Sequence, residues 1–207
     1  MEDTARLRMA SPYSAVITRE QFLFNETRIT AKLLRDGYSE DDARNKIVAE
    51  NLYQYPTEKS LERMSHVCLR RLLALHNSDL IRAIVELPAE EAKQVCLYAM
   101  MKEYRLVWDF MITVIGEKYR SHDLHFTRLD MNLFMAGLAG QDAGVASWSE
   151  STTAKLKQIL RKLLVDNGYL DSRKSEILRP VSLGKRLQKG IKANGDEICY
   201  PAFNYWE

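Results

Sequence analysis

Cysteine is scarce in this sequence. The 207 residues include three cysteines, Cys68, Cys96 and Cys199, which are widely spaced and form no Cys-x-x-Cys pair. A chain of this length can bury a core without disulfide bonds, and an odd number of cysteines does not make a disulfide framework. Cys68 and Cys96 also fall within apolar helical patterns. We therefore expect buried, reduced thiols and a reducing compartment.

Long hydrophobic runs are missing as well. The strongest candidate, residues 95–115, is interrupted by Lys102, Glu103, Arg105 and Asp109. A membrane-spanning helix needs about 18 or more predominantly apolar residues in succession. The first ten residues, MEDTARLRMA, contain no apolar core of a secretion signal. These absences predict a soluble, cytoplasmic protein without a membrane partner.

The motifs of common enzyme classes are absent too. The sequence contains no GxxxxGK[ST] phosphate loop, no GxGxxG after a predicted strand and no GxSxG. Glu40-Asp41-Asp42 and Glu90-Glu91 stand at predicted helix starts, where carboxylates complement the helix dipole, which favours a structural role over catalysis. His122-Asp123-Leu124-His125 falls in a predicted loop without companion ligands. We expect a non-enzymatic protein with no bound metal, no cofactor and no small-molecule substrate.

Glycine is unevenly distributed. Gly37 is the one glycine before residue 116, and the other eight lie at residue 116 or later. The chain before residue 116 should therefore consist of long helices. Capping residues and apolar spacing predict helices at residues 18–36, 39–53, 57–75, 78–86 and 89–119. The last of these is apolar around most of its circumference. It is predicted to be the central helix of a bundle formed by residues 1–120, with Tyr98, Tyr104, Trp108 and Phe110 in the core.

Residues 121–207 show a different pattern. A helix is predicted at 126–138 with Leu129, Leu133 and Phe134 facing inward, and another at 151–166, capped by Ser149 or Ser151 and ended by Asn167-Gly168. Two short strands, 169–170 and 177–181, are joined by the polar loop 171–176. A basic helix at 183–192 and an extended aromatic tail at 198–206 follow. The expected fold class is therefore mainly α: an N-terminal helical bundle followed by a winged-helix-like unit with a small β-hairpin.

Positive charge is concentrated in the second part. Residues 151–192 hold eleven Lys or Arg and three acidic residues, a net charge of +8, although the whole chain carries only +2. Such a field indicates a polyanionic partner, or alternatively a solvated basic face. In winged-helix modules the last helix enters the DNA major groove and the hairpin tip touches the backbone. The predicted DNA-binding residues are Ser151, Thr152, Lys155, Gln158, Arg161 and Lys162 on the helix, Arg173 and Lys174 at the tip, and Lys185, Arg186 and Lys189 beyond it.

Three stretches resemble a known family by their order and spacing. They are Glu50-Asn51-Leu52 followed by a helix with Leu69-Arg70-Arg71-Leu72; Tyr104-Arg105-Leu106-Val107-Trp108-Asp109-Phe110; and Ser149-Glu150-Ser151-Thr152 leading to Leu163-Leu164-Val165-Asp166-Asn167-Gly168-Tyr169-Leu170. Over about residues 14–181 the chain resembles BrxA, the small helical component of bacterial BREX phage-exclusion systems. The match does not include the basic stretch after residue 181.

The resemblance implies a cytoplasmic helical protein whose bundle is similar to the antitermination factor NusB. It also implies action beside a methyltransferase, an ATPase and other subunits against phage DNA, and it supplies no catalytic residues. Together with the charge pattern, it predicts a non-enzymatic component that binds double-stranded DNA, with other BREX proteins as further partners. Two alternatives stay open at this point: an adaptor that assembles other BREX subunits, and an RNA-binding protein.

Overall fold

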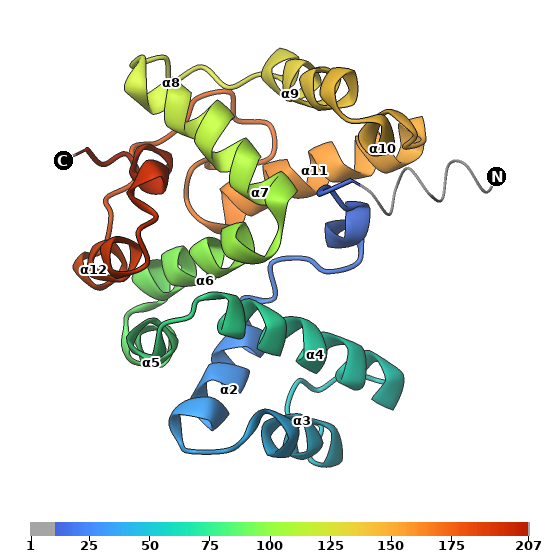
Figure 1. Cartoon of the computed structure of the whole chain (residues 1–207), viewed down its shortest axis with the longest axis vertical. Helices are drawn as coiled ribbons and strands as arrows, with labels where there is room; N and C mark the ends of the chain where they lie inside the picture. Colours follow the sequence, from blue (N-terminus) through green and yellow to red (C-terminus); the bar gives the residue numbers. More distant parts are fainter. Residues whose placement is uncertain (1–10, 207) are drawn as a thin grey trace. The chain divides into compact units, whose positions relative to one another are not determined.

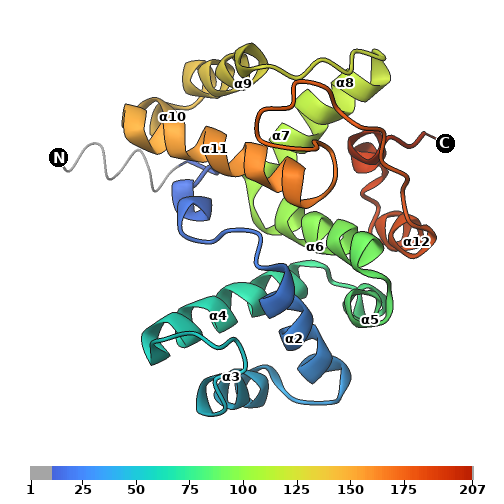
Figure 2. The same cartoon turned by 180° about the vertical axis from the view of Figure 1, so that it is seen from behind.

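The fold is mainly helical, as the sequence predicts. We describe residues 11–206 of a computed structural model, shown in Figures 1 and 2. Within these residues no helix is long and apolar enough to cross a membrane. Packing divides the described residues into two compact units, one of residues 11–21, 104–182 and 198–206 and one of residues 22–103 and 183–197. We call the first the α11 unit and the second the bundle unit. Whether residues 121–207 fold as a domain of their own stays a prediction.

The bundle unit consists of helices that local sequence signals delimit well. They are α2 (Phe24–Arg35), α3 (Glu40–Ala49), α4 (Glu58–Ala74), α5 (Ser78–Glu86), α6 (Ala89–Glu103) and α12 (Lys185–Ala193). Ser39, Thr57 and Asn77 each accept a backbone N–H in the first turn of α3, α4 and α5. Gly37 has φ +93° directly after α2, a conformation that glycine adopts without strain. The predicted starts of these three helices are confirmed.

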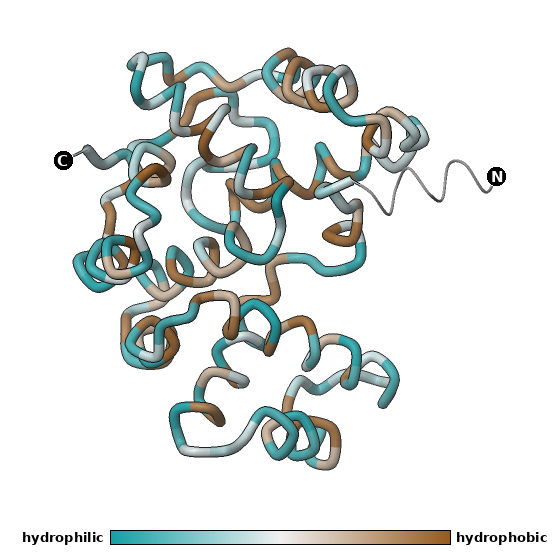
Figure 3. Tube along the Cα trace, viewed as in Figure 1, coloured by the Kyte–Doolittle hydropathy of each residue, from teal (hydrophilic) through white to brown (hydrophobic). Residues whose placement is uncertain are grey.

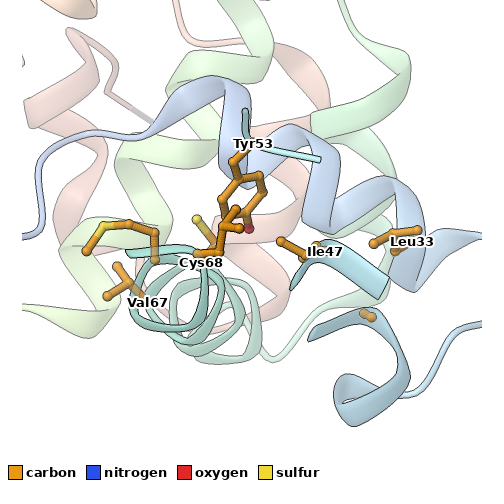
Figure 4. Close-up of a cluster of buried hydrophobic side chains, with 8 residues drawn as sticks. Leu33, Ile47, Tyr53, Val67 and Cys68 are labelled. Atoms are coloured by element: carbon orange, nitrogen blue, oxygen red, sulfur yellow. The ribbon is translucent and has the colours of Figure 1, made fainter. Parts of the chain in front are cut away.

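The core of the bundle unit is apolar with a small polar network inside. Figure 4 shows Leu33, Ile47, Tyr53, Val67 and Cys68 gathered between the helices. The hydroxyls of Tyr53 and Thr30 lie 2.5 Å apart. Burial raises the pKa of the Cys68 thiol, which keeps it in the unreactive protonated form. Cys68, Cys96 and Cys199 are all free and buried, as predicted.

The predicted single helix over residues 89–119 is wrong. Tyr104 has an extended backbone (φ −119°, ψ 109°) and ends α6 at Glu103. The chain continues as α7 (Arg105–Phe110), a π-helix (Met111–Gly116) and α8 (Glu117–Arg120). The Tyr104 hydroxyl donates a 2.5 Å hydrogen bond to the buried carboxylate of Glu20. This partner lies 84 residues away in the chain, so hydropathy and helix propensity give no sign of the break.

The α11 unit also holds η1 (Ala15–Thr18), α9 (Arg128–Gln141), α10 (Ala143–Ala146), α11 (Glu150–Asp166) and most of η3 (Glu197–Phe203). Two predicted features of the N- and C-terminal segments are wrong. Thr18 does not open a helix that runs to residue 36; it is the last residue of the short 3-10 helix η1. The helix predicted there, α2, begins only at Phe24. The aromatic tail is a 3-10 helix rather than an extended segment, although Tyr200 and Phe203 are buried as docking requires.

α11 forms as its sequence predicts. Ser149 accepts the Thr152 backbone N–H at the start, and Gly168 with φ +76° follows its end. Its apolar stripe is buried along its whole length: Leu156, Ile159, Leu160, Leu163 and Leu164. This buried stripe fixes which side of α11 can face a partner.

Two other side-chain predictions in this unit need correction. The buried face of α9 is formed by Met131, Phe134, Met135 and Leu138, so Phe134 faces inward as predicted. Leu129 and Leu133, however, are 63% and 62% exposed. They lie on the opposite side because the core contacts of Met131, Phe134, Met135 and Leu138 determine how α9 is rotated about its own axis. The apolar residues of α9 are spread around the helix and do not by themselves indicate this rotation. Trp108 is only half-buried, whereas Phe110 beside it is fully buried.

The predicted β-hairpin is not present in the described residues. The two stretches predicted as strands share one hydrogen bond, from the Arg179 N–H to the Tyr169 carbonyl. Residue 177 instead forms an isolated antiparallel bridge with His125, flanked by hydrogen bonds from Phe126 N to Glu176 O and from Leu178 N to Leu124 O. The chain after α11 therefore pairs with the segment before α9, and the part of the chain that the structure describes contains neither a sheet nor a hairpin wing.

Candidate nucleic-acid interface

The α11 unit contains a groove lined mainly by cations. Residues of α9, of α11 and of the loop after α11 line it, and its volume is about 470 Å³. Figure 2 shows where these three segments lie in the fold. Five of its lining residues are basic and one is acidic, so the groove presents a positive field to solvent. We call it the basic groove; its lining residues are Arg128, Met131, Asn132, Lys157, Gln158, Arg161, Arg173, Lys174 and Glu176.

Arg161 builds one wall of the basic groove. Its Nε donates to the Arg173 carbonyl at 2.6 Å, and its Nη2 donates to the Ser175 carbonyl. The guanidinium also stacks over the Phe126 ring, 5.4 Å from the centroid. Burial lowers the pKa of Arg161, although a guanidinium remains charged at any physiological pH. The side chain thus holds the loop of residues 171–176 against α11; its predicted contact with DNA stays a prediction.

The other predicted residues of α11 differ in their surroundings. Lys155 and Gln158 are exposed, and Gln158 lines the basic groove. Lys162 forms an ion pair with Asp166 one turn along the same helix. Ser151 and Thr152 lie in the first turn, where their hydroxyls are 3.0 Å and 2.9 Å from the Ser149 hydroxyl. Ser151 and Thr152 therefore belong to the hydrogen-bonded cap at the start of α11, where Ser151 is exposed and Thr152 is half-buried.

The loop after α11 supplies the remaining two residues of the α11 unit's predicted site. Arg173 and Lys174 are exposed and both line the basic groove. They are the two central residues of a hydrogen-bonded turn, in which the Ser175 N–H donates to the Ser172 carbonyl at 3.1 Å, and Arg161 bonds to the backbone of the same loop. Arg173 and Lys174 therefore share one loop, although residues 11–206 form no hairpin; their contact with DNA stays a prediction.

Lys185, Arg186 and Lys189 belong to α12 in the bundle unit and form a separate group there. Arg186 donates to Glu86 at 2.6 Å and to the Asp79 carbonyl at 3.2 Å, which ties α12 to α5. Lys185 and Lys189 are exposed. The eleven predicted residues therefore do not form one continuous site within either unit.

Five lining residues of the basic groove escaped the sequence prediction, and three of them carry hydrogen-bond donors: Arg128, Asn132 and Lys157. Lys157 lies one turn before Arg161 on α11 and donates to Asn132 Oδ1 of α9 at 2.8 Å. Arg128 and Asn132 come from α9, which shows no excess of basic residues. The spacing of Lys157 and Arg161 is a usable signal, because residues four apart share a helix face. Nothing local in the sequence predicts that Arg128 and Asn132 would join them.

The described residues offer no competing site for metal-dependent chemistry. Among residues 11–206 no group of three or more His, Cys, Asp or Glu side chains is placed to hold a metal ion. The histidines of residues 122–125 lie at the isolated bridge and in the turn before it.

Comparisons with known proteins agree on one family. The model of the BrxA family matches residues 11–195. A protein named BREX protein BrxA from Bacillus cereus (strain H3081.97) is 35% identical over 188 residues, which cover 90% of this chain and 93% of that protein. Another of the same name from Paramagnetospirillum magneticum (strain ATCC 700264 / AMB-1) is 26% identical over 190 residues, 91% and 95% of the two chains.

A solved structure shows the same fold. The crystal structure of an uncharacterized protein from Magnetospirillum magneticum superposes with a TM-score of 0.79, covering 93% of this chain and 98% of that one at 23% identity. Together with the family model, which spans most of the sequence, the 35% identity to the Bacillus cereus protein establishes the relationship. The chain belongs to the BrxA family.

Proposed function

We propose that this protein is a non-enzymatic component of a BREX antiphage defence system that binds double-stranded DNA in the basic groove. The names of its relatives support the assignment to a BREX system. The observation that carries DNA binding is the groove itself, where five cations from two helices and a loop face one acidic residue. In the proposed mechanism these cations neutralise DNA phosphates and release counterions.

Duplex DNA fits this groove better than single-stranded nucleic acid. Proteins that bind single strands stack bases on exposed aromatic side chains. The nine residues that line the basic groove include no aromatic side chain. The aromatic ring nearest to the cations, Phe126, is fully buried beneath Arg161. A phosphate backbone, which needs only charge and hydrogen-bond donors, therefore suits the groove.

The helices around the groove retain part of the expected recognition geometry. α9, α10 and α11 follow one another with short turns, as in a helix-turn-helix. Gln158 on the groove side of α11 carries an amide that can pair with an adenine edge in the major groove. Lys155 one turn earlier is exposed and extends the positive surface. We propose that α11 approaches the major groove while Arg173 and Lys174 contact the backbone.

A gel-shift comparison tests this function. The wild-type protein is titrated against a duplex DNA, the corresponding single strand and an RNA of the same sequence, each at two salt concentrations. We expect the tightest binding to the duplex and a steep loss of affinity at the higher salt. Preference for RNA, or an affinity that does not change with salt, would contradict the proposal and favour the RNA-binding or adaptor function.

The adaptor function has one observation in its favour. Leu129 and Leu133 on α9 are largely exposed, and neighbouring apolar side chains on a surface commonly mark protein contacts. The two functions do not exclude each other, because these leucines do not line the basic groove. Association with other BREX proteins therefore remains part of the proposal.

A further inference from the structure

One carboxylate lines the basic groove together with its five cations. This carboxylate belongs to Glu176, whose side chain is exposed. The loop that carries it, residues 171–176, consists of polar and charged residues only, and Figure 3 shows it on the hydrophilic side of the colour scale. Burial lowers the pKa of Arg161 and the charge of Glu176 partly opposes this shift, so the two side chains are close enough to interact through space. Among residues 11–206, however, Glu176 forms no ion pair.

Cations of the groove have other partners, which leaves this carboxylate available to a ligand. Arg161 donates to the Arg173 carbonyl at 2.6 Å and to a second carbonyl of the same loop. Lys157 donates to Asn132 Oδ1 at 2.8 Å. These hydrogen bonds, which shape the groove, are accepted by carbonyl and amide oxygens, and the Glu176 carboxylate takes no part in them.

The backbone around Glu176 is fixed, although its side chain is exposed. The Glu176 carbonyl accepts the Phe126 N–H at 2.8 Å. Ser175 before it is held by Arg161 of α11, and Ile177 after it forms the isolated bridge with the segment before α9. Anchoring of this kind holds a functional side chain in a defined place. The carboxylate is therefore presented from a well-anchored main chain directly beside α11.

A carboxylate in this groove cannot bind DNA phosphates. The oxygens of an ionised carboxylate only accept hydrogen bonds, and phosphate oxygens are acceptors as well. The two groups also repel each other by charge. If the protein contacted phosphates alone, Glu176 would weaken binding. Its carboxylate contributes to affinity only where the ligand offers a hydrogen-bond donor.

Cytosine is the base whose major-groove edge suits a carboxylate. Of the four bases, only cytosine and adenine present an amino donor there, whereas guanine and thymine present acceptors. In adenine the acceptor N7 lies beside the amino group, so one oxygen of a bound carboxylate would face it. In cytosine a C–H group lies beside the N4 amino group, and Glu or Asp commonly accepts from N4. Adenine instead matches an amide, such as that of Gln158 in the same groove.

From this geometry and chemistry we propose that Glu176 is a specificity-determining residue, which accepts a hydrogen bond from the N4 amino group of a cytosine while the surrounding cations bind phosphates. The inference rests on the proposed function, because it requires a duplex in the basic groove. It adds to that function a defined base preference, which phosphate contacts alone do not provide. Glu176 on the loop and Gln158 on α11 then read different base pairs of one site.

Selection from a random pool of duplexes, followed by titration, tests this preference. The wild type is titrated at one salt concentration against a selected duplex and against duplexes in which each C·G pair in turn becomes T·A. We expect one position at which the change weakens wild-type binding about tenfold. Glu176→Ala should reduce this ratio to about one at that position only. Its affinity for unselected duplexes should equal or exceed that of the wild type, because a charge that repels phosphates is gone.

A second substitution distinguishes base reading from a structural role. Glu176→Gln replaces the carboxylate by an amide of similar shape, which pairs with adenine. It should shift the preference at that position from cytosine to adenine, an effect that a merely structural residue would not produce. Asp171→Ala is the matched control, because Asp171 lies in the same loop, pairs with Arg179 at 2.8 Å and does not line the groove. It removes the same charge and should leave the cytosine preference unchanged. Both carboxylates are exposed, so all three variants should unfold thermally like the wild type.

The outcomes separate this inference from the proposed function. Loss of the cytosine preference in Glu176→Ala, together with its change to adenine in Glu176→Gln, would support the inference. A wild type that binds duplexes with no cytosine preference at any position, or a Glu176→Ala variant that keeps the preference, would overturn the inference and leave DNA binding in place. A wild type that binds no duplex would remove the proposed function and this inference with it.

Discussion

Cationic side chains tie segments together in both units, but in the α11 unit a further group of them lines a groove. In the bundle unit, Lys102 pairs with Asp196 at 2.5 Å, Arg186 with Glu86 at 2.6 Å and Arg70 with Glu103 at 3.1 Å. Each of these pairs joins two segments of that unit. In the α11 unit, Lys157, Arg173 and Lys174 instead gather around the basic groove, where Glu176 is the single acid. Net charge along the sequence does not separate these two uses, because they depend on which carboxylates lie nearby in space.

The largest expected effect concerns the core of the α11 unit. Phe110 is fully buried and packs edge-to-face against Phe126 and Phe134. Phe110→Ala should lower the free energy of unfolding by about 3–5 kcal/mol, as for other large core truncations. Trp108→Ala should cost clearly less, because Trp108 is half-buried. Urea denaturation of both variants measures this difference, and equal losses would show that Trp108 belongs to the core after all.

A second expected effect is a difference in lost stability between a variant of Arg161 in the α11 unit and a variant of Arg186 in the bundle unit. Arg161→Ala removes two hydrogen bonds to the loop backbone and the stack on Phe126, and should destabilise by about 2–3 kcal/mol. Arg186→Ala removes an ion pair whose side chains are 36% and 45% exposed and should cost less than about 1 kcal/mol. Thermal unfolding of the two variants provides the measurement. Unchanged stability of the Arg161 variant would mean that this side chain does not hold the loop.

A third effect is a pH dependence at the start of α9. Burial acts to raise the pKa of Asp130, but Lys118 at 2.8 Å and the hydrogen bonds from Thr127 outweigh it, so this pKa lies below its usual value. A carboxyl with a lowered folded-state pKa adds stability above its unfolded pKa of about 3.9, and this stability is lost as pH falls through the folded-state pKa.

Asp130→Asn should therefore destabilise by about 1 kcal/mol at neutral pH, and the difference from wild type should shrink as the pH falls below about 4. Denaturation at a series of pH values measures it. Asp41→Asn on α3 is a suitable control, because Asp41 is 78% exposed and pairs only with Arg44 in a surface contact. A difference that is constant over this pH range would speak against the ionised carboxylate as the source of the stability.

The smallest expected effect concerns the exposed side of α9, where Leu129 and Leu133 lie. Leu129→Gln and Leu133→Gln each replace a side chain that is more than 60% exposed, so each should change the free energy of unfolding by less than about 0.5 kcal/mol at low protein concentration. Met131→Gln on the buried face of the same helix should be severely destabilising. A large loss of unfolding free energy in either leucine variant would instead support the inward orientation of these side chains that the sequence predicts.

How far the sequence predicts the structure differs between the units for a physical reason. Ser39, Thr57 and Asn77 cap helices through contacts within three residues, so the start of each helix is encoded locally. The break at Tyr104 depends on Glu20, and the pairing of Leu178 with Leu124 spans 54 residues of chain. Such long-range contacts leave no periodic trace, which explains why the hairpin and the helix over 89–119 were predicted wrongly.

The candidate site was partly predictable for the same reason. The buried leucine stripe of α11 leaves one side of the helix outward, and Gln158 and Arg161 on that side line the basic groove as the periodicity indicates. Arg128 and Asn132 join from another helix. The contribution of α9 could not be predicted, because the rotation of α9 is set by Met131 and Met135 in the core and not by its overall pattern.

The salt dependence of duplex binding tests the central claim most directly. The variant Lys157→Ala/Arg173→Ala/Lys174→Ala removes three groove cations but keeps the backbone carbonyls that Arg161 contacts. The matched control Lys32→Ala/Lys59→Ala/Arg63→Ala removes three exposed cations of the bundle unit. If the groove binds phosphates, the log–log slope of affinity against salt should become shallower by about 0.9 for each lost contact in the groove variant and should stay unchanged in the control. Equal affinities and equal slopes for the wild type and the groove variant would contradict the account.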